Sequence, residues 1–293
     1  MDIPLLDLTE DPTSLAPVVD HALRTSGFLL VTGHGIDPAL PAAVRAETLR
    51  FFHGDPATKA PYERPLGDAG WRPPGTEANA YTLGMATPPD LKEAFLVLPG
   101  GDNRHPTLTP PALAYTAELD RLTRELLTLL AFTLGDDHVI ASTTTDPYRS
   151  LSMTWYPALE RVGEPLAGQW RIGPHSDFGT ITILDRQPGL GGLQIQALDG
   201  EWIDAPYVPG ALTVNVGDLM ARWTGDRWRS TMHRVLPPPA DAPAEELLSL
   251  VFFVETNLDA LIETFPPPIG GGTTYEPVTC GDYLASKFAA ITV

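Results

Sequence analysis

Hydrophobic residues recur at helical spacing in three segments of the first half of the chain. Residues 12–26 and 38–53 each place apolar side chains on one helical face and predict two helices. Leucines recur through residues 109–134 and predict a longer third helix. The pair Pro110–Pro111 suits the first turn of that helix, and Gly135 suits its C-terminal end.

The second half has a different pattern, in which short apolar runs alternate with clusters of Gly, Pro and Asp. These runs predict strands at residues 151–156, 180–184, 193–197, 211–216 and 247–254. Regularly punctuated short strands are typical of a sandwich or barrel. A final helix is predicted at 281–290. We therefore expect one domain over 1–293, with a mainly helical subregion at 1–148 and a β-rich core at 149–293.

Three further segments of the first half lack helical spacing. Residues 3–8 contain Pro4 and fit an edge strand, and residues 28–31 read as a buried strand. Residues 61–106 are rich in Pro, Gly and polar groups, which predicts a long loop of the kind that often carries function. Three residues of this loop are candidates for a substrate mouth, although packing within the loop is the simpler interpretation: Trp71, Asn79 and Tyr81.

Charge and cysteine content narrow the classes of partner. The chain has 19 basic and 37 acidic residues, a net charge of -18, which argues against nucleic acid as a partner because phosphate binding needs a basic surface. No apolar stretch approaches the ~20 residues of a membrane span. The acidic N-terminus lacks the basic start of a secretory signal. The single Cys280 fits a reducing, cytoplasmic location.

The segment around His175 carries the most informative chemistry. On an extended segment, His175 and Asp177 point to the same side and can reach one ion. His233 lies 233 − 177 = 56 residues beyond Asp177 and is the candidate third ligand. Two imidazoles and one carboxylate form the facial triad of non-haem iron(II) oxygenases, which leaves positions open for an organic cosubstrate and dioxygen. Taken alone, a His-x-Asp tripeptide is more often an ordinary hydrogen-bonded pair, and zinc accepts a similar ligand set.

Several blocks along nearly the whole chain support the iron interpretation because they follow one another in a recognisable order. They are Ile3–Leu8, Gly27–Ile36, Asp90–Phe95, His175–Gly179, Gly191–Gln194, Pro209–Leu212, Asn215–Leu219 and Ser230–Val235. In these blocks the chain resembles the isopenicillin N synthase-like family of iron(II) and 2-oxoglutarate-dependent oxygenases. The resemblance implies an α+β fold, with a double-stranded β-helix (a distorted, cupin-like jelly roll) as the core over 149–293 and flanking helices.

The resemblance also implies the roles of individual residues. His175, Asp177 and His233 would hold Fe(II), and Tyr156 matches a tyrosine that can hydrogen-bond a bound carboxylate, although a core aromatic is an equally good interpretation. The implied cofactors are Fe(II) and 2-oxoglutarate. The implied partners are dioxygen and a small organic substrate of secondary metabolism, which would be hydroxylated, desaturated or cyclised. Three residues near the barrel turns are assigned to structure: Asn215, Gly217 and Asp218.

The strand after His233 departs from the family pattern of Arg-x-Ser, whose arginine pairs with the distal carboxylate of 2-oxoglutarate. Ser249 is in place, but Leu247 stands at the arginine position. Leucine cannot pair with a carboxylate, and a buried unpaired charge costs roughly 3–5 kcal/mol. Arg171 or, as second choice, Arg149 would then supply the cation. Two alternatives are a synthase-like oxidase whose substrate supplies the electrons, and a catalytically silent ligand-binding relative.

Overall fold

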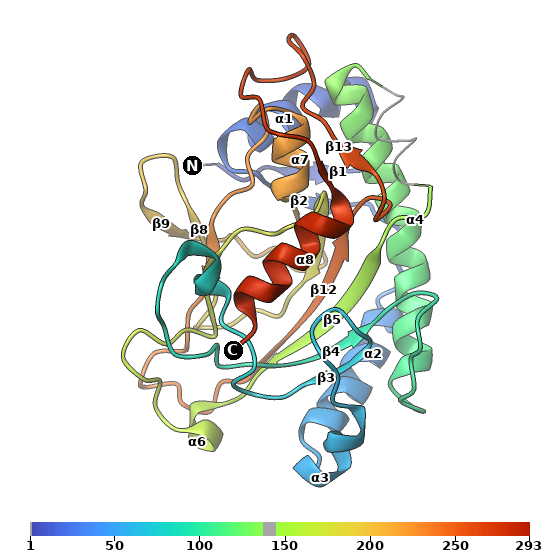
Figure 1. The fold of residues 1–293 in the computed structure, drawn as a ribbon. Coiled ribbons are helices and arrows are strands. Elements are labelled where there is room, and N and C mark those ends of the chain that lie inside the picture. Colours follow the sequence, from blue (N-terminus) through green and yellow to red (C-terminus); the bar gives the residue numbers. More distant parts are fainter. Residues whose placement is uncertain (1, 137–144) are drawn as a thin grey trace.

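The computed structural model describes residues 2–136 and 145–293, and two sheets dominate it (Figure 1). The larger sheet has the strand order β1-β2-β10-β7-β12-β5-β4-β3, and its pairs are antiparallel except for β1 with β2. Its strands are β1 (Leu5–Asp7), β2 (Phe28–Thr32), β3 (Gly70–Arg72), β4 (Glu93–Val97), β5 (Arg149–Tyr156), β7 (Ile181–Asp185), β10 (Leu212–Val216) and β12 (Leu247–Val254).

The smaller sheet has the order β6-β11-β8-β9 and is antiparallel throughout. Its strands are β6 (Ile172–His175), β11 (His233–Val235), β8 (Leu193–Gln196) and β9 (Trp202–Asp204). A separate short pair joins β13 (Leu261–Ile262) to β14 (Val278–Thr279). Two opposed, mainly antiparallel sheets with helices outside them form the jelly-roll, α+β architecture that the resemblance implies.

The helices pack outside the two sheets (Figure 1). They are α1 (Pro12–Thr25), α2 (Ala39–Phe52), α3 (Pro56–Lys59), α4 (Thr109–Leu134), α6 (Leu159–Val162), α7 (Asp218–Trp223) and α8 (Cys280–Ile291), with 3-10 turns η1 (Ala60–Tyr62) and η2 (Asn79–Leu83). Local chemistry sets their ends. Asp11 caps α1 by accepting a hydrogen bond from the Thr13 amide at 2.8 Å. Gly135 ends α4 in the left-handed region at φ 75°. No helix of the described residues is long and apolar enough to cross a membrane.

The helices expected from the sequence are confirmed as α1, α2, α4 and α8, each within one residue at either end. The expected strands of the second half are confirmed as β5, β7, β8, β10 and β12. The long loop expected at 61–106 is wrong in part, because β3 and β4 lie within it and extend the larger sheet. These strands are short and buried on both faces, so neither shows the polar and apolar alternation that marks a half-exposed strand.

Strand β5 shows how the larger sheet separates the core from a cavity. Its residues Leu151, Met153 and Trp155 are almost fully buried in the core that includes residues of α1, α2 and α4. The alternate side chains face a cavity between the two sheets: Ser150, Ser152, Thr154 and Tyr156. Because successive strand residues point to opposite faces, a single strand provides both a packing surface and a polar wall.

Candidate metal centre and cofactor cavity

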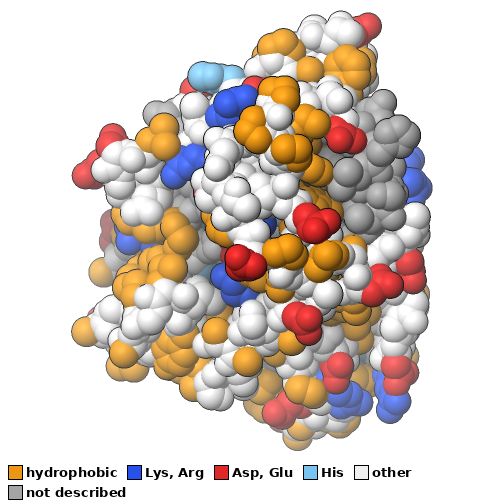
Figure 2. All heavy atoms as spheres, turned by 45° about the horizontal axis from the view of Figure 1, so that its top comes forward, with side chains coloured by type: hydrophobic (Ala, Val, Ile, Leu, Met, Phe, Trp, Pro, Cys, Tyr) orange, Lys and Arg blue, Asp and Glu red, His pale blue; other side chains and the backbone are white. Residues whose placement is uncertain are grey.

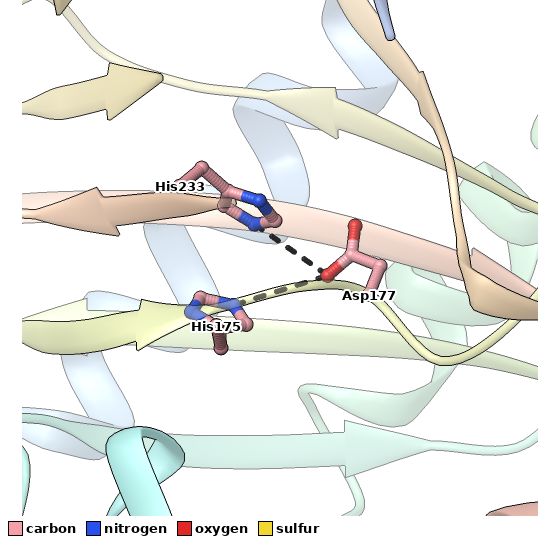
Figure 3. Close-up of side chains that lie close together, drawn as sticks. All are labelled: His175, Asp177 and His233. Atoms are coloured by element: carbon pink, nitrogen blue, oxygen red, sulfur yellow. Dashed lines mark ion pairs between the residues drawn. The ribbon is translucent and has the colours of Figure 1, made fainter. Parts of the chain in front are cut away.

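The three residues of the proposed triad point toward one another (Figure 3), and all three line the cavity. His175 is the last residue of β6, Asp177 follows in the next loop, and His233 is the first residue of β11. Strands β6 and β11 pair antiparallel with His233 directly opposite His175. The pairing of two short strands therefore brings together ligand candidates that are far apart in the sequence.

The spacing of the three side chains suits a shared ion. The Nε2 atoms of His175 and His233 lie 3.9 and 3.6 Å from Asp177 Oδ1, and one ligand atom from each residue lies within 4.8 Å of the others. These distances exceed a hydrogen bond. They fit three atoms placed around a common centre, each about 2.0–2.2 Å from it as N and O ligands of a divalent ion are.

Hydrogen bonds to the backbone fix the orientation of both imidazoles. Nδ1 of His175 lies 2.8 Å from the Gly173 carbonyl oxygen, and Nδ1 of His233 lies 3.1 Å from that of Thr231. Because a carbonyl only accepts, each Nδ1 carries the proton and each Nε2 keeps its lone pair for a ligand bond. Burial and the neighbouring His233 lower the pKa of His175 to about 3, which keeps this ring neutral.

Asn215 holds the carboxylate of the triad. Its Nδ2 donates to Asp177 Oδ2 at 2.6 Å, which leaves Oδ1 directed at the two imidazoles. Burial acts to raise the pKa of Asp177, but the imidazoles and the hydrogen bonds from Thr182 and Asn215 hold it below its usual value. The assignment of Asn215 to a structural turn is therefore wrong. It lies within β10, and its contact with Asp177 crosses between segments, where sequence spacing gives no signal.

The cavity has a volume of about 180 Å³ and is lined by both sheets. Next to the triad, Glu255 is buried, and burial with the nearby charge of Asp177 raises its pKa to about 8. Gly179 leaves the space that this carboxyl group needs, because a Cβ there would lie 1.8 Å from Glu255 Oε2. Sequence reasoning missed Glu255, which sits just beyond the end of a strand that looks almost entirely apolar.

Tyr156, Ser249 and Leu247 line the cavity together. Strands β5 and β12 pair with Tyr156 opposite Leu247 and Ser249 opposite Thr154. Burial raises the pKa of the Tyr156 phenol, so this group stays protonated and can donate a hydrogen bond to a carboxylate. The pair predicted from the resemblance therefore lies on one wall, next to the leucine that replaces the family arginine.

The two arginines considered as replacements are both engaged elsewhere. Arg171 is 1% exposed, and its Nη1 forms an ion pair with Glu245 Oε1 at 2.8 Å while Nη2 donates to the Glu245 carbonyl at 2.9 Å. Arg149 pairs with Asp120 at 3.1 Å. Neither side chain lines the cavity, although the Arg171 guanidinium lies 5.7 Å from the Tyr156 ring centre.

The three candidates from the segment 61–106 separate in the structure. Asn79 lines the cavity and donates to Asp90 at 2.7 Å. Trp71 packs in the core on the helical side of the larger sheet and donates to Glu93 at 2.9 Å. Tyr81 donates to the Thr87 carbonyl within its own loop. Of the three, only Asn79 is placed to meet a ligand.

On the face drawn in Figure 2, basic side chains are scattered among acidic and hydrophobic ones and form no continuous patch.

Comparison with known protein families agrees with this site. Residues 151–256 match the family model described as the 2OG-Fe(II) oxygenase superfamily. Residues 3–114 match a second family model, described as "non-haem dioxygenase in morphine synthesis N-terminal". Validamycin A dioxygenase of Streptomyces hygroscopicus subsp. limoneus is 38% identical over 97% of this chain and 85% of its own length. Homoarginine-6-hydroxylase of rice (Oryza sativa subsp. japonica) is 28% identical over 98% of this chain and 92% of its own length.

Solved structures give the same result. A full-length protein of Neurospora crassa, determined in complex with alpha-KG (2-oxoglutarate), has a TM-score of 0.83 and 27% identity, and the match covers 98% of this chain and 96% of that one. The fold, the site and these matches together define a jelly-roll dioxygenase. The chain belongs to the 2OG-Fe(II) oxygenase superfamily and is an iron(II) and 2-oxoglutarate-dependent oxygenase of the isopenicillin N synthase-like type. It acts with a small-molecule substrate and dioxygen.

Proposed function

We propose that His175, Asp177 and His233 are the protein ligands of the catalytic iron. The observation that carries this assignment is the convergence of one ligand atom from each residue, within 4.8 Å, in a buried position. The donor set of two imidazoles and one carboxylate suits Fe(II) and leaves coordination positions for a keto acid and dioxygen. When bound, the iron with 2-oxoglutarate and dioxygen supplies the oxidising power.

The residues of the chain position the reactants and exclude water. The neutral imidazoles of His175 and His233 direct Nε2 to the metal, and Asn215 keeps Asp177 in register with them. We assign the Tyr156 phenol and the Ser249 hydroxyl to the distal carboxylate of 2-oxoglutarate. Both groups line the same cavity as the triad, and both can donate a hydrogen bond to a carboxylate.

The substrate that fits the remaining cavity is a small molecule with both polar and apolar groups. Ser150, Ser152 and Thr154 place a row of hydroxyl groups along β5, and Lys92 with its ion-pair partner Glu77 extends the polar wall. Most of the remaining wall is apolar and includes Phe178 and Phe288. The names of the relatives refer to validamycin A and homoarginine, which supports a small-molecule substrate. Oxidation would take the form of hydroxylation, desaturation or ring closure.

The lone Cys280 is buried and free, which supports a reducing compartment such as the cytoplasm as the site of action.

The decisive experiment is an anaerobic titration of the protein with Fe(II) and then with 2-oxoglutarate. A visible charge-transfer band is expected, because the keto acid chelates the metal held by the triad. His233→Ala should lose the band together with tight Fe(II) binding, whereas the control His21→Ala, at an exposed position on α1, should keep both. An unchanged band in His233→Ala would overturn the assignment of the ligands.

A further inference from the structure

The carboxylate end of the cavity lacks the cation that the family carries on β12. Leu247 fills that position, and its side chain packs so closely on the 188–190 turn that a Cβ at Gly189 would lie 2.7 Å from it. Arg171 and Arg149 are both held in ion pairs outside the cavity. A distal carboxylate bound beside Ser249 therefore needs a positive charge from another strand.

Arg186 is the residue that the strand register places beside Ser249. Strands β7 and β12 pair antiparallel down to Asp185 opposite Leu250, and continuing this register by one residue sets Arg186 opposite Ser249. Directly opposed residues of antiparallel strands have Cβ atoms about 4.5–5.5 Å apart. The side chain of Arg186 also lies on the cavity side of the sheet, because the alternate residues Thr182, Leu184 and Arg186 all line the cavity.

The guanidinium group of Arg186 is anchored but lacks a counter-charge. Its Nη2 donates to the carbonyl oxygens of Ala205 at 2.9 Å and Pro206 at 2.6 Å, and the group lies 5.4 Å from the Tyr207 ring centre. Its Nε is buried without a hydrogen-bond partner. No carboxylate among residues 2–136 and 145–293 forms an ion pair with it.

Arg72 and Lys92 are the rivals, because both also line the cavity. Arg72 lies on β3, which is separated from β12 by β4 and β5. The ammonium group of Lys92 is already bonded to the carboxylate of Glu77, and both side chains are 10% exposed, so the charge of Lys92 is balanced within the protein. Lys92 also precedes β4, which is separated from β12 by β5. Arg186 by contrast adjoins β12 directly, and an incoming carboxylate would supply the counter-charge that its half-buried guanidinium lacks.

We propose that Arg186, from the end of β7, supplies the cation for the distal carboxylate of 2-oxoglutarate, beside Ser249 and in place of the missing arginine at Leu247. The proposal rests on the proposed position of the keto acid between the triad and Ser249. A guanidinium would still pair with the distal carboxylate, as in the family, but it would come from the end of β7 and not from β12.

Anaerobic calorimetry on the Fe(II)-loaded protein tests this with two ligands, 2-oxoglutarate and 2-oxopentanoate, which has a methyl group in place of the distal carboxylate. Arg186→Gln should weaken 2-oxoglutarate binding by about 30-fold or more and leave 2-oxopentanoate binding unchanged. The matched control is Arg161→Gln, which also removes an arginine stacked on an aromatic ring (Trp155) but lies outside the cavity lining.

Equal weakening of both ligands by Arg186→Gln would overturn the proposal, since it would reveal a general structural role. Unchanged 2-oxoglutarate affinity would also overturn it. Absence of a charge-transfer band with either keto acid in the unaltered protein would instead reject the proposed function, so the two failures are distinguishable.

A second variant keeps the test decisive if Arg186→Gln does not fold. In the unaltered background, Leu247→Arg adds a second guanidinium to a carboxylate that Arg186 already pairs with, so 2-oxoglutarate binding should change little. In the Arg186→Gln background, the same substitution should restore binding by returning the cation to β12. A gain of about 30-fold or more in 2-oxoglutarate affinity from Leu247→Arg alone would show that the pocket has no cation and would overturn the proposal.

Discussion

The metal-binding and carboxylate-binding ends of the cavity differ in how closely their residues follow the family pattern. At the metal end, each ligand candidate has its own partner, namely the carbonyls of Gly173 and Thr231 for the imidazoles and Asn215 for Asp177. At the carboxylate end, β12 keeps Ser249 but has Leu247 at the position of the family arginine. An ion fixes its ligands to within tenths of an ångström, whereas a carboxylate accepts a guanidinium from any strand that reaches it. The metal end therefore keeps the family pattern, and the carboxylate end can change.

The strongest test of this contrast is the removal of a metal ligand. Asp177→Ala should lower Fe(II) affinity by well over the ~10–100-fold that the loss of an outer partner costs, and turnover should fall with it. Equilibrium dialysis of Fe(II) and oxygen-consumption rates measure the two effects. Near-native Fe(II) binding in this variant would show that a residue of the metal centre can be replaced without loss of binding, as proposed for the carboxylate end.

Asn215→Ala tests a residue that contacts the metal ligand Asp177 and not the metal itself. Without its amide, Asp177 loses the 2.6 Å hydrogen bond that orients it, and Fe(II) affinity should fall by about 10–100-fold. Equilibrium dialysis measures this change, and Asn257→Ala, which removes a loop amide bonded to Thr145 away from the cavity, serves as the control. An effect as small as that of the control would remove Asn215 from the metal centre.

Tyr156→Phe tests the carboxylate end of the cavity. The change removes a neutral hydrogen bond of about 0.5–1.5 kcal/mol, so 2-oxoglutarate affinity should fall about 2- to 10-fold. Calorimetric titration with 2-oxoglutarate gives the value. A loss as large as that expected for Arg186→Gln would mean that the phenol, and not a cation, dominates recognition at this end.

Glu255→Gln should have the smallest effect on turnover and a clear effect on the pH dependence of stability. Because burial raises the pKa of Glu255 to about 8 while the unfolded chain titrates near its model value of 4.5, only the folded state holds this proton between those values. The free energy of unfolding of the metal-free protein should then decrease as pH rises from about 5 to 8, by at most about 1.4 kcal/mol per pH unit. Chemical denaturation in chelator should show a shallower decrease in the variant, and equal slopes would contradict a protonated Glu255.

Much of the fold could be predicted from the sequence because its signals are local. Helical spacing predicted α1, α2, α4 and α8, and apolar runs predicted β12 and four other strands. The short strands β6, β9 and β11 gave no such signal, since none of them contains an apolar run or a clear polar and apolar alternation. Two of these strands, β6 and β11, carry the imidazoles of the metal centre.

The sequence by itself determined the ligand types, the blocks of the family and the absence of an arginine at Leu247. Only the tertiary structure decided that Asn215 holds Asp177, that Arg171 is committed to Glu245 and that Arg186 lines the same cavity as Ser249. The physical reason is that periodicity reports which side of its own strand a residue faces. Which strands become neighbours, and in what register, is set by pairing between segments that are far apart in the chain.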